Sequence, residues 1–322
     1  MYRLLKCIFA AVIAMTMLCG CTEIAEEIPL PNTETTAPEA QPYPVQAGSL
    51  LFEQAPETVG SLSPAVTEII CELGYGNKII GISSYCNYPE NISSKNKLGS
   101  AANPDVDAII AAAPELLISM SPIAKKDITA IEAAGTRVWI IAPPSTAEEM
   151  YNCYYDIAAV FGGSIDCADV AENAVEPLKK AFADANGAID SYVYVMSPDL
   201  AVASDATFAG NFFSHFGTNA AGDTEELSLS TEKLIELDPE WLIFPDYMSK
   251  YELSEETAVL SAVKNNRIIY LDENLMERIE RPTSRLETAV FDVLSQIEAI
   301  ENEVTASDSE SEVTAESDTE EE

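Results

Sequence analysis

The sequence predicts an α/β protein in which two Rossmann-like lobes are joined by one long helix. Three features of the chain support this. Short apolar strands alternate with helical segments from residue 59 to 141, a long helical stretch follows, and the alternation begins again at residue 191. Alternating strands and helices are typical of a parallel sheet with helical crossovers. A helix between two such series would connect two lobes.

The first strand–helix–strand unit lies in residues 59–89. Ser63 is a preferred N-cap type and Pro64 suits the first helical position, so a helix is expected to start there. Gly74 can end this helix, and residues 78–82 form the next apolar strand. In open α/β sheets ligands bind at the carboxyl ends of strands. The loops that follow these two strands, including Ser63, are therefore candidate ligand loops.

The other predicted elements continue this alternation. In the first lobe we expect a helix from 106 to near Pro114, a helix over 123–134, strands over 116–119 and 137–141, and a helix capped by Ser145 or Thr146. The Phe161-Gly162-Gly163 break separates that helix from the connecting helix. In the second lobe we expect strands over 191–196, 241–244 and 267–271, a helix that follows residues 205–208 and stops at Gly217, and helices over 231–236 and 283–298.

Both ends of the chain differ in composition from its middle. Residues 1–20 have a basic start and a short apolar run that resembles a secretory signal, and Cys21 follows the small Gly20 as in the lipobox of bacterial lipoproteins. That resemblance implies cleavage before Cys21 and lipidation of its thiol. The alternatives are an unlipidated signal or a membrane anchor, although the run is shorter than the roughly 20 residues of a spanning helix.

The sequence divides into six segments on this basis. Residues 21–54 contain no Lys or Arg and many Pro, Thr and Glu residues, so we predict a disordered tether there. Residues 301–322 hold ten acids and no bases, which predicts an acidic disordered tail. The remaining boundaries are a signal peptide over 1–20, a first lobe over 55–163, a connecting helix over 164–188 and a second lobe over 189–300.

The chain is strongly acidic, with a formal charge of −37. Residues 58–300 alone contain 37 acids and 15 bases, so the tails do not account for all of it. Phosphate backbones attract clustered Lys and Arg, and we therefore exclude nucleic acid as a partner.

Four cysteines would remain beside a lipidated Cys21. An exported chain can form disulfides, and the local pairs would be Cys71 with Cys86 and Cys153 with Cys167. The two other pairings and free buried thiols stay open.

Several segments together resemble the substrate-binding proteins of ABC importers for cobalamin, ferric siderophores and heme. The resemblance covers roughly residues 57–300 and rests on the segments SLSPAVTEIICELG, GISSYCNYP, NPDVDAIIAAAPELLIS, STEKLIELDPEWLIF and VKNNRIIYLDENLMERIERPTSRL. It implies a bilobed monomeric receptor with little hinge closure, which holds a metal chelate between its lobes and delivers it to a membrane permease driven by an ATPase. It implies no catalytic cofactor.

The resemblance and the chemistry of chelate pockets together point to candidate ligand-binding residues in both lobes. They are Ser63, Tyr85, Tyr88, Met120 and Ser121 in the first lobe and Thr207, Phe208, Tyr247, Met248, Arg281 and Arg285 in the second. The two arginines match the family's last loop-to-helix motif and would pair with a carboxylate or phosphate on the ligand. The alternatives are pairing of these arginines with the protein's own acids, loop packing for the tyrosines, and core packing for Met120 and Phe208.

Family members also carry a surface acid on each lobe that meets basic residues of the permease. Glu232 falls at this position in the second lobe, whereas Lys125 occupies it in the first, with Asp127 two residues later. Where a cobalamin receptor carries aromatic residues, this chain has Ala101 or Ala102, Met120 and Glu226. The resemblance therefore does not imply specificity for corrinoids, and a siderophore or heme is also an open choice of ligand.

The sequence contains no recognisable catalytic constellation. It has one histidine, His215, which lies among phenylalanines and is expected to pack in a helix. A single histidine also argues against a direct zinc or manganese receptor. There is no phosphate-binding GK[ST] loop and no serine elbow. The alternatives to a receptor are a surface-anchored α/β hydrolase or metalloenzyme, or an acidic adhesion or scaffold lipoprotein.

Overall fold

The computed structural model describes residues 42–319, apart from 223, 225–227 and 251–254. All of these residues belong to one compact unit, Ala40–Glu322. The predicted signal peptide, the lipidation site Cys21, most of the tether and Glu226 lie outside the described residues. Within the described part of the chain, no helix is both long enough and apolar enough to span a membrane.

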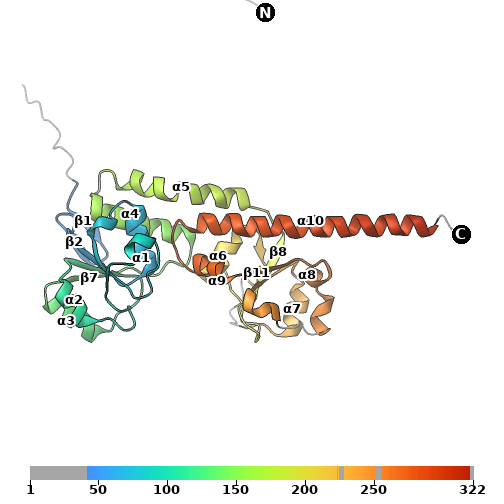
Figure 1. Cartoon of the computed structure of the whole chain (residues 1–322), viewed down its shortest axis with the longest axis horizontal. Coiled ribbons are helices and arrows are strands. Elements are labelled where there is room, and N and C mark those ends of the chain that lie inside the picture. Colours follow the sequence, from blue (N-terminus) through green and yellow to red (C-terminus); the bar gives the residue numbers. More distant parts are fainter. Residues whose placement is uncertain (1–41, 223, 225–227, 251–254, 320–322) are drawn as a thin grey trace, which may run out of the picture. The chain divides into compact units, whose positions relative to one another are not determined.

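The first lobe, coloured blue to green in Figure 1, contains a parallel sheet of five strands in the order β5-β4-β3-β6-β7. Numbered within the lobe, this is the order 3-2-1-4-5, in which the chain reverses direction across the sheet between β3 and β6. The carboxyl ends of strands at such a switch point are where ligands bind in doubly wound folds. The strands are β3 Val59–Ser61, β4 Ile79–Ile82, β5 Asn96–Lys97, β6 Leu116–Ser119 and β7 Arg137–Ile140.

Helices connect the strands of this sheet, and local sequence signals fix where several of them begin. Thr146 caps α4 by accepting a hydrogen bond from Glu149 N, and Asp105 caps α2 in the same way from Ala108 N. Both caps follow a strand-exit loop and precede an apolar stripe. The helices are α1 Pro64–Glu72, α2 Val106–Ala112, α3 Lys125–Ala133 and α4 Ala147–Gly162, with short 3₁₀ turns at Gly76–Lys78 and Glu90–Ile92.

The second lobe contains a parallel sheet of four strands in the order β11-β10-β8-β9. Within the lobe this is the order 2-1-3-4 read from its other edge, and its switch point lies between β8 and β10. The strands are β8 Ser191–Tyr194, β9 Thr218–Asn219, β10 Trp241–Pro245 and β11 Ile268–Leu271. The helices are α6 Phe208–Ser214, α7 Thr231–Leu237, α8 Ser261–Lys264 and α9 Glu273–Ile279. Two 3₁₀ turns cover Asp246–Lys250 and Glu255–Val259.

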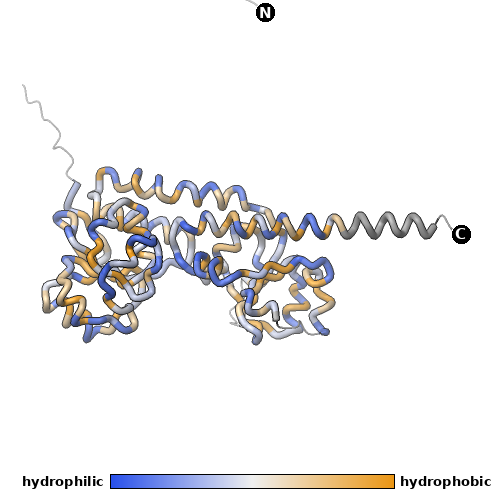
Figure 2. Tube along the Cα trace, in the orientation of Figure 1, coloured by the Kyte–Doolittle hydropathy of each residue, from blue (hydrophilic) through white to orange (hydrophobic). Residues whose placement is uncertain are grey.

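Helix α5, Cys167–Ala185, connects the two lobes, as the sequence predicts. Its apolar residues recur along one face (Figure 2), and Val175, Leu178 and Phe182 are buried. These residues belong to one core cluster that includes Ile118 of the first sheet and Ile243 of the second. The connecting helix therefore packs into a hydrophobic core that includes residues of both sheets.

The predicted tether ends earlier than residue 54. Strands β1 Val45–Ala47 and β2 Leu50–Phe52 form an antiparallel hairpin on the first lobe. Phe52 is fully buried, its ring meets Trp139 edge-on at 6.2 Å, and the guanidinium carbon of Arg137 lies 4.4 Å from its centroid. The hairpin is a folded part of the first lobe, so the predicted boundary at 54/55 is wrong.

The last helix is longer than predicted. Helix α10 runs from Leu286 to Thr319, beyond the expected end at Glu298 and into the segment predicted to be disordered. It packs beside α5 (Figure 1), and Ala289, Val290 and Val293 are buried. A second helix thus runs along the connector.

The four cysteines of the described residues carry no disulfide. Of the alternatives that the sequence left open, the structure has the free thiols and neither of the two local pairs. Cys86, Cys153 and Cys167 are buried, and Cys71 is half-buried. Burial raises the pKa of Cys71 to about 11 and the pKa of Cys153 to about 12, because a thiolate is poorly solvated there.

Candidate functional site

A buried hydroxyl network forms the exit loop of β3. The Ser61 hydroxyl donates to Ser63 O at 2.9 Å, and the Thr67 hydroxyl donates to Ser61 Oγ at 2.9 Å. Ser63 occupies the N-cap position of α1, but its side chain makes no capping bond with the described backbone, and the residue is buried. The expected cap is in the right place, whereas the loop is held by the neighbouring hydroxyls.

The exit loop of β4 presents two tyrosines. Tyr85 is 71% exposed. Tyr88 is less exposed, because the guanidinium carbon of Arg285 lies 4.0 Å from the centre of its ring. The Tyr85 side chain is open to solvent, whereas one face of Tyr88 is covered by protein, and contact of either with a ligand stays a prediction.

Met120 and Ser121 follow β6 and have opposite environments. Met120 is buried in the first-lobe core, as the alternative of core packing expected, and Ser121 is exposed. The Ser119 hydroxyl donates to Ser121 O at 2.8 Å and accepts from Ser121 N at 3.0 Å. Only Ser121 of this pair reaches the surface of the loop.

Thr207 and Phe208 begin helix α6 of the second lobe. Thr207 Oγ1 accepts from Gly210 N at 3.0 Å and donates to Ser204 O at 2.8 Å, so its hydroxyl serves as the helix cap. Phe208 is half-buried against the core. The structure gives both residues structural roles, and their contact with a ligand stays a prediction.

Tyr247 and Met248 follow β10, at the switch point of the second sheet. Met248 is buried in the second-lobe core. Tyr247 is 54% exposed, and its hydroxyl donates to the carbonyl of Met196, which follows β8. This hydrogen bond fixes one end of the tyrosine while leaving its ring open to solvent.

Arg281 and Arg285 bind acids of the protein itself. Arg281 Nη1 lies 2.7 Å and Arg285 Nη1 3.2 Å from Oε1 of Glu68, which is fully buried on α1. Thr283 Oγ1 donates to the other oxygen of this carboxylate at 3.2 Å. This arrangement matches the alternative of internal pairing, and it connects the segment after α9 to the first lobe.

A second set of contacts joins the exit loop of β4 to helix α9. Asn87 Nδ2 donates to Glu277 Oε1 at 2.7 Å, and Asn87 Oδ1 accepts from Arg281 Nη1 at 2.7 Å. Arg281 Nη2 also pairs with Glu277. The strand-exit loop of one lobe therefore meets the strand-exit helix of the other.

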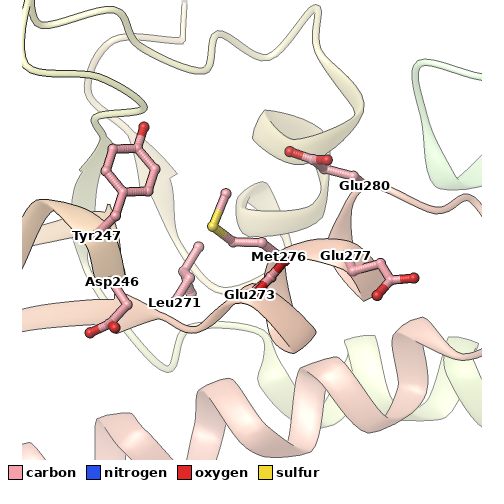
Figure 3. A pocket seen from close by; sticks show the side chains of 7 residues that line it. All are labelled: Asp246, Tyr247, Leu271, Glu273, Met276, Glu277 and Glu280. Atoms are coloured by element: carbon pink, nitrogen blue, oxygen red, sulfur yellow. The ribbon is translucent and has the colours of Figure 1, made fainter.

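A cavity of about 630 Å³ lies in the second lobe beside this contact. It is lined by Asp246, Tyr247, Leu271, Glu273, Met276, Glu277 and Glu280. Figure 3 shows Tyr247 and Glu280 extending from opposite sides toward the space above Met276, while Asp246 and Glu277 point away from that space. Its volume falls within the range of small-molecule pockets.

Of the residues lining this cavity, sequence reasoning identified only Tyr247. Nothing in the sequence singles out Met276 or the acids of α9 as cavity residues, because an amphipathic helix commonly exposes acids to solvent. Glu68 was missed as well, although its place among the apolar residues of α1 is unusual for a carboxylate. A buried acid in a helix of this kind indicates a cationic partner, here two arginines.

The predicted docking positions are both exposed. Glu232 lies in the first turn of α7, where hydrogen bonds from its own backbone N–H and from Ser230 lower the pKa of its carboxyl. Lys125 is the first residue of α3 and is exposed, with Asp127 half-buried on the same helix. Of the other two aligned positions that the structure describes, Ala101 is buried and Ala102 is exposed.

His215 is packed as the sequence predicts. Its ring stacks on Phe182 with centroids 3.8 Å apart, and its Nε2 has no hydrogen-bond partner among the described residues. Burial lowers the pKa of this imidazole. Among the described residues no group of three or more His, Cys, Asp or Glu side chains is arranged to hold a metal ion.

Comparison with known proteins supplies the family. The "Periplasmic binding protein" family matches residues 59–275. An uncharacterized ABC transporter substrate-binding lipoprotein, YvrC of Bacillus subtilis, is 24% identical over 286 residues, which are 84% of this chain and 90% of that protein. A cobalamin-binding protein of Halobacterium salinarum is 23% identical over 296 residues, which are 85% of this chain and 79% of that protein.

A solved structure shows the same fold. A possible iron-binding (periplasmic solute-binding) protein of Staphylococcus epidermidis superposes with a TM-score of 0.64 at 21% identity, covering 76% of this chain and 99% of that one. The family match spans both sheets and the connecting helix. The chain therefore belongs to the periplasmic binding protein family.

Proposed function

We propose that this protein is the extracytoplasmic receptor of an ABC importer and that it holds a metal chelate for delivery to the permease. The chelate is a ferric siderophore, heme or a corrinoid. The observation that carries the proposal is the contact of Asn87 with Glu277 beside a cavity of about 630 Å³. Asn87 lies on the exit loop of β4 and Glu277 on the helix that follows β11, and ligands bind at the carboxyl ends of strands in other doubly wound folds.

The mechanism needs binding and docking only, and no bond of the ligand is broken. The exposed rings of Tyr85 and Tyr247 supply apolar contact area from the two lobes, and Ser121 adds a polar group. The paired arginines hold the lobes together at Glu68. We therefore expect the ligand to enter a cleft that is largely preformed and to leave when the permease separates the lobes.

Lipidation of Cys21 would hold this receptor at the membrane as a monomer. The name of the Bacillus relative, a substrate-binding lipoprotein, supports an extracytoplasmic, lipid-anchored location. Glu232 would then meet a basic residue of the permease, while Lys125 replaces the corresponding acid on the first lobe. Docking would be asymmetric, with the second lobe supplying the acidic contact.

A thermal-shift panel tests ligand binding directly. The chain from residue 21 carrying Cys21→Ser would be melted with cobalamin, heme and several ferric siderophores. A ligand that binds the native state raises the melting temperature by mass action, so at least one chelate class should do so. No shift with any chelate at saturating concentration would contradict the proposal.

Uptake separates binding from docking. Glu232→Lys should abolish chelate uptake by cells and leave chelate affinity unchanged, because the residue is exposed on α7 and does not line the cavity. The matched control is Glu236→Lys on the same helix, which should transport normally. Normal uptake by Glu232→Lys would reject its docking role.

A further inference from the structure

The lining of the cavity carries charge of one sign. Its ionisable carboxyl residues are Asp246, Glu273, Glu277 and Glu280, and none of its lining residues is basic. Glu277 is paired with Arg281, whereas the other three have no ion-pair partner among the described residues. Any preference of this cavity for charged ligands rests on the proposed function, under which the chelate binds here.

The arginines near the cavity are occupied by the protein. Arg281 binds Glu68, Glu277 and Asn87, and Arg285 binds Glu68 while covering the ring of Tyr88. Arg278, at the end of α9, binds Asp292 and donates to Thr288 at 2.9 Å. An anionic chelate would have to displace a protein carboxylate before any of these guanidinium groups could receive it, and for Arg281 and Arg285 that carboxylate is the fully buried Glu68.

Glu280 and Tyr247 lie on opposite sides of the cavity. Glu280 is exposed, and in Figure 3 its carboxylate is directed across the cavity toward Tyr247 and Met276. The hydroxyl of Tyr247 is held by the Met196 carbonyl, so the ring is fixed with its face accessible. A carboxylate opposite an aromatic ring complements an ammonium group, through charge on one side and cation–π attraction on the other.

We propose that the cavity selects chelates with a net positive charge, and that a pendant ammonium group of the ligand lies between the Glu280 carboxylate and the Tyr247 ring. The same cavity disfavours anionic chelates, because the unpaired Glu280 carboxylate extends into it, its lining has no basic residue and the nearby arginines are engaged elsewhere. Neutral chelates of the same shape bind through apolar contact alone and lack this contribution.

A pair of ligands that differ in one charge tests this. The probes are a ferric trihydroxamate with a pendant primary ammonium group and the same chelate N-acetylated at that amine. The Cys21→Ser chain should bind the ammonium form about tenfold more tightly, a difference of about 1.4 kcal/mol. Because salt screens charges that are open to solvent, the difference should shrink at 1 M NaCl.

Variants locate the effect within the cavity. Glu280→Gln should weaken binding of the ammonium form about tenfold and leave the acetylated form unchanged. Glu132→Gln, an exposed acid of α3 with no ion-pair partner among the described residues, is the matched control and should change neither. Full retention of affinity for the ammonium form by Glu280→Gln would overturn the inference.

The outcomes also separate this inference from the proposed function. Equal affinity for the two forms, or tighter binding of heme than of the ammonium form, overturns the charge selection and leaves a chelate receptor in place. Binding of neither form, together with no response to heme or cobalamin, overturns the proposed function and the charge selection with it.

Discussion

The guanidinium group of Arg281 lies 2.7 Å from the fully buried carboxylate of Glu68, although 213 positions separate the two residues in the chain. Arg285 and Thr283 bind the same carboxylate. Helix α1 of the first lobe is thereby attached to the segment that leaves α9 of the second lobe. This contact, together with helices α5 and α10, fixes the strand-exit loops on either side of the proposed ligand site.

Glu68→Gln should destabilise the protein by about 3 kcal/mol, because it removes one charge of a buried pair and leaves two arginines without their partner. The free energy of unfolding would be measured in urea at pH 7. The exposed acid variant Glu132→Gln should stay within about 0.5 kcal/mol of the wild type. Equal stability of the two variants would show that the Glu68 contact does not brace the lobes.

Phe52→Ala should also destabilise the protein by about 3 kcal/mol or more, because a fully buried aromatic side chain is removed from its contact with Trp139. The adjacent Leu51 is 51% exposed, so Leu51→Ala is the matched control and should have little effect. Chemical denaturation of both variants checks this. A small effect of Phe52→Ala would mean that the hairpin is not part of the first-lobe core.

His215 should titrate below its usual pKa of about 6.5, because burial disfavours the imidazolium ion. The unfolded chain then takes up this proton more readily than the native protein. The contribution of the neutral His215 side chain to stability is therefore fully present above pH 6.5 and is lost as the pH falls below that value. NMR of this single histidine measures its pKa, and titration at or above 6.5 would contradict the packing described.

His215→Phe should reduce the loss of stability that the wild type shows as the pH falls from 7 to 5. The phenyl ring can keep the stacking on Phe182 and has no group that titrates. Melting temperatures of both proteins across this range measure the difference. An unchanged pH dependence would assign the decrease to other groups.

The four thiols of the Cys21→Ser chain should react with a disulfide reagent only slowly in the native state at pH 8. Burial holds the pKa of Cys71 at about 11 and that of Cys153 at about 12, so little reactive thiolate is present. In denaturant, without reductant, all four should react. A count of two reactive thiols would indicate one disulfide and a count of none would indicate two, and either result would contradict the structure.

Much of the fold follows from local sequence patterns. The strand at 116–119 has the predicted bounds, and α1 begins at Pro64 after Ser63, because apolar runs and helix caps are local signals. The hairpin at 45–52 has no such signal. Its strands are three residues each, and its burial comes from Phe52 packing on Trp139, which is distant in sequence.

The candidate site was less predictable for the same reason. The position of a strand-exit loop follows from the strand, and Tyr85, Ser121 and Tyr247 are exposed on such loops. Whether Arg281 faces a ligand or Glu68 depends on a contact between segments more than 200 residues apart. From the sequence alone, the acids of α9 that line the cavity cannot be told apart from acids on the solvent-facing side of a helix.

Binding of a chelate by Tyr247→Ala tests the central claim most directly. Tyr155, on α4 in the first lobe, is exposed to a similar degree and does not line the cavity, so Tyr155→Ala is the matched control. Titration with whichever chelate raises the melting temperature should show saturable one-to-one binding that Tyr247→Ala weakens at least tenfold and Tyr155→Ala preserves. Equal affinity in both variants would contradict the placement of the ligand in this cavity.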